Sequence, residues 1–206
     1  MLTRLILSVF FLFSVCCTAL SAPTKYVNYD DGVVSVLKNE VGNPAKWDPR
    51  FFPLVVDIAP GLSAYEYREI DKAINAWETA TGLDLFEPQI TYSTQDILNP
   101  SAGHVSIRYG DLTKSAVPTA IGGTTPYYVV QYPELVHSMV VVLDLSLINS
   151  KYIYGTVVHE LGHVLLLDHD AYVGSIMVDS ATAEKGAKIL PKHVYFVRQM
   201  HGPELD

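Results

Sequence analysis

The chain has 206 residues and carries 14 lysines and arginines against 22 aspartates and glutamates, a net charge of −8. This acidic balance, without any run of basic residues, argues against nucleic acid and anionic membranes as partners. The length leaves room for one domain of ordinary size.

A secretory signal peptide is predicted at residues 1–22. Arg4 precedes the apolar run Leu5–Val15, and small residues lead to Ser21 and Ala22, where cleavage is expected. The apolar run is shorter than the ~20 residues that span a bilayer. We therefore expect a secreted protein with no stable membrane association after cleavage.

Both cysteines, Cys16 and Cys17, lie inside this signal peptide. The mature chain would therefore contain no disulfide, and its stability must come from a hydrophobic core. We divide the rest of the chain into a short, turn-rich segment at 23–45 and one domain at 46–206.

Short apolar or alternating stretches bounded by turn residues predict strands. They lie at 33–37, 51–58, 104–109, 127–131 and 139–143. The stretch Gly122–Pro126 is expected to form a loop.

Three helices are predicted. The first begins at a capping box formed by Ser63 and Glu66 and ends at Gly82. The second should run over about 149–165, and the third over 191–202, with a proline in its first turn. Strands interspersed with three helices imply an α/β domain with a twisted, mixed sheet.

The second helix carries a metal-ligand pattern. His159 and His163 are four residues apart, so they lie one turn apart on the same helix face. Neutral imidazole nitrogens suit Zn²⁺, and three protein ligands leave the fourth position to water. Glu160 follows the first histidine and is placed to take a proton from that water.

His169 is the candidate third ligand. In a continued helix it would lie about 240° around the axis from His163 and face away from the metal. The chain must therefore leave the helix near Leu165 or Leu166 and double back. Asp168 is the alternative third ligand, although imidazole is the commoner partner for zinc in such sites.

These residues resemble the signature of the metzincin metallopeptidases, in which a methionine-containing turn follows the zinc motif. The match reads His159-Glu160-Leu161-Gly162-His163-Val164-Leu165-Leu166-Leu167-Asp168-His169, followed by Ser175-Ile176-Met177. The spacing to Met177 is similar to that of the matrixins. Stretches at 47–58, 74–77, 121–124, 140–144 and 189–202 also look like landmarks of the matrixin catalytic domain.

The resemblance implies a metzincin-type α+β catalytic domain with a methionine turn. It implies one catalytic Zn²⁺ bound by His159, His163 and His169, with Glu160 as the general base. The expected function is that of a secreted zinc metalloendopeptidase, active as a monomer on protein or peptide substrates. Substrate would lie along a sheet edge near 122–128, with an apolar side chain in a pocket between 156–157 and the loop after the methionine.

The chain departs from the family pattern at several positions. Leu166 replaces the glycine that lets the family's helix end in a left-handed turn, and leucine there costs ~1–2 kcal/mol. Asp170 follows the third histidine, where matrixins usually carry serine. No propeptide cysteine is present, and Asp30 or Asp31 is a candidate for covering the zinc before activation.

Two other classes of function stay open. A catalytically silent, matrixin-like binding protein would need a defect in the ligands or the base. A structural zinc protein would need a fourth protein ligand, from Asp168, Asp170 or a distant residue. The remaining histidines are expected to have surface or helix-capping roles: His104, His137, His193 and His201.

Overall fold

The computed structural model of the chain describes residues 27–29, 32–39, 42–92, 97–113, 115, 120–144, 150–172, 174–178 and 187–202. The predicted signal peptide therefore lies outside the described residues, as do Asp30, Asp31 and residues 179–186. Within these ranges, none of the helices is long and apolar enough to cross a bilayer.

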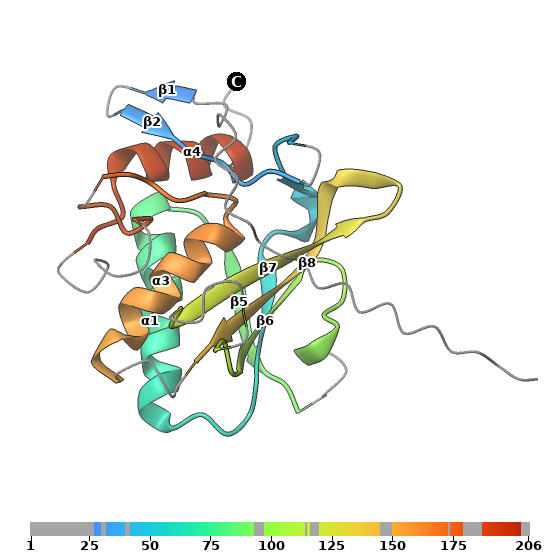
Figure 1. The fold of residues 1–206 in the computed structure, drawn as a ribbon, viewed down its shortest axis with the longest axis vertical. Coiled ribbons are helices and arrows are strands. Elements are labelled where there is room, and N and C mark those ends of the chain that lie inside the picture. The colour runs from blue at the N-terminus through green and yellow to red at the C-terminus, as the bar shows by residue number, and fades with distance from the viewer. Residues whose placement is uncertain are drawn as a thin grey trace, which may run out of the picture.

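A six-stranded sheet forms the centre of the fold (Figure 1). Its strands are β3 (Lys46–Trp47), β4 (Leu54–Ile58), β5 (Phe86–Ile90), β6 (His104–Tyr109), β7 (Gly122–Val129) and β8 (Tyr132–Leu143). The order is β3-β8-β6-β4-β5, with β7 paired to β8. The β7–β8 pair is antiparallel and the other pairs are parallel, so the sheet is mixed.

The helices are α1 (Ala64–Thr81), α3 (Ile153–Val164) and α4 (Pro191–His201), with single 3₁₀ turns η1 (Pro49–Phe51) and η2 (Ser150–Tyr152). Helices α1 and α3 pack side by side against the sheet, and α4 lies at the end of the molecule next to a small hairpin (Figure 1). The hairpin joins β1 (Val27–Tyr29) to β2 (Gly32–Val34). The predicted α/β fold with a mixed sheet and three helices is confirmed.

Helix α1 forms as its sequence predicts. The Ser63 hydroxyl accepts a hydrogen bond from the Glu66 N–H, and the Glu66 carboxylate accepts one from the Ser63 N–H. Gly82 ends the helix with φ 68°. The indole N–H of Trp77, fully buried, donates to the Val158 carbonyl at 2.8 Å and so fixes α1 against α3.

The prediction of a loop at Gly122–Pro126 is wrong, because these residues begin strand β7. Their backbone pairs with β8 from Gly122 opposite Leu143 onward. A Cβ atom on Gly122 would lie 2.7 Å from the Glu160 carboxylate and from the Thr156 methyl. The glycine therefore marks a close approach between strand and helix, which sequence reasoning mistook for a turn.

Several element boundaries also differ from the prediction, among them those of β8, β4 and α3. Strand β8 begins at Tyr132 rather than at Met139. Its first half mixes exposed residues with the buried Val136, so it forms no continuous apolar run, and its backbone pairs with β3 and β7. Strand β4 begins at Leu54, after η1. Helix α3 begins at Ile153, after η2.

The segment after the hairpin packs into the body of the domain. Val34 and Val36 are buried in the main hydrophobic core. The Leu37 N–H donates to the Leu166 carbonyl, and the Asp168 N–H donates to the Ser35 carbonyl, both at 2.9 Å. This segment therefore supports the turn that follows α3.

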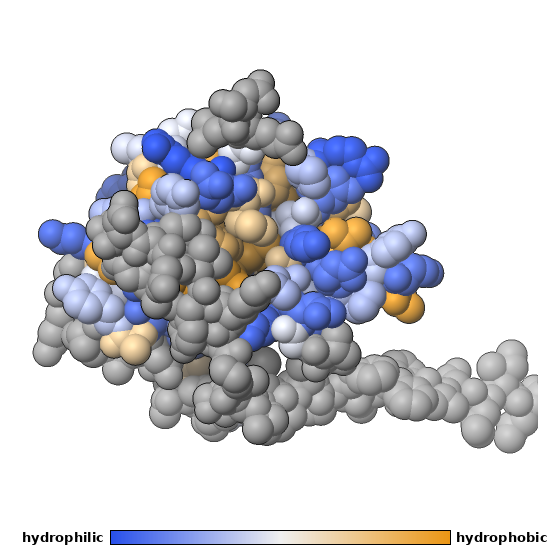
Figure 2. Space-filling model, turned by 90° about the horizontal axis from the view of Figure 1, so that it is seen from above, coloured by the Kyte–Doolittle hydropathy of each residue, from blue (hydrophilic) through white to orange (hydrophobic). Residues whose placement is uncertain are grey.

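The surface around α4 carries both hydrophobic and hydrophilic side chains. Figure 2 shows a hydrophobic area in the middle of this face, bordered by hydrophilic residues. On α4 itself, Tyr195 and Met200 are exposed while Phe196 and Val197 are buried. The helix thus turns one apolar face to the core and leaves part of its apolar surface to solvent.

Candidate metal centre

Helix α3 brings His159 and His163 together. Their Nε2 atoms lie 3.1 Å apart, close to the ~3.4 Å between two ligands at 2.0–2.1 Å from one tetrahedral zinc. The Nδ1 atoms face the carbonyls of Ile176 at 2.7 Å and Leu167 at 2.8 Å. A carbonyl only accepts hydrogen bonds, so each Nδ1 carries the hydrogen and each Nε2 presents a lone pair.

His169 joins this pair from the chain beyond the helix. The three imidazoles offer ring nitrogens that all lie within 4.8 Å of one another. Its ring centroid is 5.3 Å from that of His159 and 4.8 Å from that of His163. Three neutral imidazoles at this spacing could bind one zinc ion and leave a fourth position open.

The alternative ligand, Asp168, has a different role in the structure. Its Oδ1 accepts a hydrogen bond from the His169 N–H at 2.7 Å. The metal-ligating group found among the described residues contains the three histidines and not this aspartate. The geometry therefore favours His169 over Asp168 as the third ligand.

The chain leaves the helix at Leu166, with φ 71°. The Leu167 N–H donates to the Gly162 carbonyl and the Leu166 N–H to the His163 carbonyl, the two hydrogen bonds of a Schellman ending. The predicted departure from the helix near Leu165 or Leu166 is confirmed, and Leu166 takes the left-handed conformation where glycine is usual. Leu166 is fully buried, so burial of its side chain offsets the backbone strain.

The turn containing Met177 packs against α3 at Gly162, the residue before His163. A Cβ atom on Gly162 would lie 2.2 Å from the Met177 sulfur, so only glycine allows this approach. The Ser175 hydroxyl accepts a hydrogen bond from the Met177 N–H at 3.0 Å. Because the same turn supplies the Ile176 carbonyl, it both supports α3 and orients His159.

Glu160 is buried beside the histidines, with 4% of its surface exposed. The Thr124 hydroxyl on β7 donates a hydrogen bond to its Oε2 at 2.7 Å. Burial raises the pKa of Glu160 to about 7, while the Thr124 hydrogen bond and the nearby His169 oppose the rise. Burial, together with His159 and His169, lowers the pKa of His163 well below its usual value, so this imidazole is neutral.

A buried polar network anchors the residue after His169. Lys192, at the start of α4, forms an ion pair with Asp170, and both side chains are largely buried. The other Asp170 oxygen accepts a hydrogen bond from the Tyr172 N–H at 2.9 Å. His193 caps α4, because its Nδ1 accepts a hydrogen bond from the Leu190 N–H at 3.2 Å, and burial lowers its pKa to about 4.

Sequence reasoning missed Thr124 and the Lys192–Asp170 pair. Thr124 was placed in a loop, and 36 residues separate it from Glu160. Residues 122–129 show no alternation of apolar and polar side chains, so the sequence carried no local signal for the beginning of this strand. No local pattern links Lys192 to Asp170.

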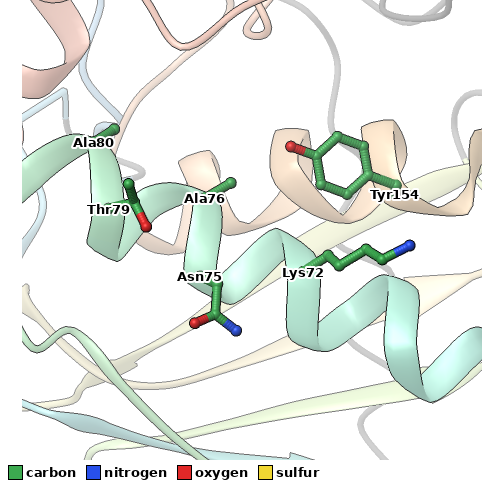
Figure 3. Close-up of a pocket in the computed structure, with 6 residues that line it drawn as sticks. All are labelled: Lys72, Asn75, Ala76, Thr79, Ala80 and Tyr154. Atoms are coloured by element: carbon green, nitrogen blue, oxygen red, sulfur yellow. The ribbon is translucent and has the colours of Figure 1, made fainter.

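A separate surface hollow contains none of the three histidines among its lining residues. It is an open groove of about 600 Å³ between α1 and α3 (Figure 3), lined by Lys72, Asn75, Ala76, Thr79, Ala80 and Tyr154. Its single charged residue, Lys72, is paired with Glu69. We therefore locate the candidate chemistry at the histidines and not in this groove.

Comparison with known proteins gives a limited result. No protein-family model matches the sequence, and no curated protein does. Among solved structures, the chain is similar to metalloproteinase-II from Bacteroides fragilis, at 12% identity and a TM-score of 0.49, over 77% of this chain and 56% of that one. It is also similar to archaemetzincin from Methanopyrus kandleri, at 14% identity and a TM-score of 0.47, over 75% of this chain and 94% of that one. This chain thus spans little more than half the length of the first.

Proposed function

We propose that the chain is a secreted zinc metalloendopeptidase of the metzincin type, similar to the matrixins. The observation that carries the proposal is the group of His159, His163 and His169, with ring nitrogens within 4.8 Å of one another, beside the buried carboxylate of Glu160. The signal-peptide pattern at 1–22 supports secretion.

Each residue of the site has a defined task in peptide hydrolysis. A zinc ion held by the three histidines would polarise the scissile carbonyl and lower the pKa of water. Glu160 takes one proton from the attacking water and delivers it to the nitrogen of the leaving amine. The water oxygen adds to the carbonyl carbon first, and the C–N bond breaks afterwards. The second proton of the water also passes to the amine, so the products are a carboxylate and an ammonium group.

The substrate would bind as an extended peptide along β7. This strand pairs with β8 on one side, and among the described residues no strand pairs with its other side. A peptide backbone could add there as a further strand. An apolar pocket at Thr156 and Val157 stays a prediction, because both side chains are buried and residues 179–186 lie outside the described residues. The enzyme is proposed to act as a monomer.

Cleavage of an internally quenched peptide by the mature protein tests the proposal. We expect turnover that a zinc chelator abolishes and that added zinc restores. Zinc bound without turnover on a broad peptide library would instead favour the catalytically silent binding protein. Zinc that a chelator removes only as the protein unfolds, again without turnover, would favour a structural zinc site.

A further inference from the structure

The Thr124 hydroxyl lies at the centre of the contact between β7 and α3. Its Oγ1 is 2.7 Å from Glu160 Oε2 and 3.3 Å from the Glu160 carbonyl oxygen. The shorter distance and the negative charge make the carboxylate the stronger acceptor. Thr124 is half-buried and Glu160 is buried, so water competes little for this hydrogen bond.

The other carboxylate oxygen is also bounded by β7. A Cβ atom on Gly122 would lie 2.7 Å from Glu160 Oε1 and 3.2 Å from the carboxylate carbon. The strand therefore holds the carboxylate by a hydrogen bond at Thr124 and by backbone contact at Gly122. A glutamate in open space would rotate freely about its last torsion.

We propose that Thr124 is a positioning residue for the general base. Its hydroxyl holds Oε2 and so fixes the rotation of the Glu160 carboxylate, which leaves Oε1 as the oxygen that receives the proton. Efficient proton transfer needs an acceptor held at hydrogen-bond distance from the proton. This inference rests on the proposed peptidase function and adds a residue to it.

Three variants of the mature protein test the role, each assayed for kcat, KM and zinc content. Thr124→Val keeps the shape of the side chain and removes the donor. We expect kcat to fall about 10-fold or more, with KM within about threefold and zinc content unchanged. Thr124→Ser keeps the hydroxyl, and its kcat should recover to within about threefold of the wild type.

Thr79→Val is the matched control. Thr79 is exposed on α1 and lines the groove of Figure 3, which contains none of the residues of the proposed site. Thr79→Val makes the same chemical change as Thr124→Val outside that site. Its kcat and KM should equal those of the wild type.

Two results would overturn the inference while leaving the proposed function intact. One is a Thr124→Val enzyme with wild-type kcat. The other is a Thr124→Ser enzyme as slow as Thr124→Val, which would assign the effect to the lost methyl contact. A wild-type protein without chelator-sensitive turnover would overturn the proposed function and this inference with it.

Discussion

His159 and His163 lie one turn apart inside α3, whereas His169 lies on chain that has already left the helix. We call these the helix half and the turn half (residues 165–170) of the centre. The histidines of the helix half are buried and oriented by backbone carbonyls, while His169 is exposed. The turn half is instead held by distant segments, through Ser35, Leu37 and the Lys192–Asp170 pair. The helix half thus depends on the four-residue spacing of its histidines, whereas the turn half depends on contacts with distant segments of the chain.

Removal of a helix-half ligand should have the largest effect. We expect His163→Ala to lose both bound zinc and peptidase activity, because the two remaining ligands, His159 and His169, cannot hold the ion alone. Elemental analysis after dialysis and a peptide-cleavage assay would measure both. A fully active variant that retains zinc would remove His163 from the centre.

The ion pair that anchors the turn half should contribute strongly to stability. Lys192→Met leaves the Asp170 carboxylate largely buried without its partner, and we expect the free energy of unfolding to fall by ~3–5 kcal/mol. Urea denaturation of the zinc-free protein would measure the change. The double variant Lys192→Met/Asp170→Leu should recover part of the loss, because it leaves no unpaired charge.

Arg50→Met provides the control for this ion pair. Arg50 pairs with Asp48 at the surface, where solvent screens the charges, so its loss should leave stability nearly unchanged. Equal effects of Arg50→Met and Lys192→Met would contradict the anchoring role of the buried pair.

The helix half could be predicted from sequence and the turn half only in outline. The spacing of His159 and His163 determines their shared face. The need to bring in His169 predicted that the chain leaves the helix near Leu165 or Leu166, and the family resemblance indicated a left-handed turn there. The supports of that turn could not be predicted, because Ser35 and Lys192 lie far from it in sequence and carry no local signal. Only the part of β7 near residues 127–129 was predicted as a strand. Its beginning was missed because Gly122 is required by the close approach of Glu160 and not by a local strand pattern.

Leu166→Gly should have a smaller effect on the turn half. Glycine relieves the strain of φ 71° but loses the burial of the leucine side chain. We expect net destabilisation below the ~2–5 kcal/mol typical of truncating a buried leucine, with zinc binding retained. Leu165→Gly, at a buried neighbour with negative φ, should cost more. The reverse order of the two variants in urea denaturation would argue against strain at Leu166.

His201, which contacts the same turn at Leu165, should make the stability of the fold modestly dependent on pH. Its ring lies near the Leu165 carbonyl and stacks on Phe52, and burial lowers its pKa to about 4. The pKa of His201 in the unfolded chain is ~6.5. Between about pH 6.5 and pH 4, the unfolded chain therefore carries a proton on His201 that the folded chain does not. Stability should therefore fall as the pH drops through this window, by ~1–3 kcal/mol from this residue.

The contribution of His201 can be isolated by comparing His201→Leu with the wild type. The variant should lose less stability than the wild type between pH 7 and pH 4.5, as measured by urea denaturation of the zinc-free proteins. Parallel pH profiles for the two proteins would show that His201 does not titrate in this way.

The most direct test of the account is a joint measurement of zinc content and turnover in Glu160→Ala. The account predicts about one zinc per chain, as in the wild type, because the carboxylate is not a ligand. It also predicts that kcat falls by ~10²–10⁴, because the general base is gone. Turnover within a few-fold of the wild type, with zinc still bound, would contradict the assignment of Glu160 and the peptidase mechanism built on it.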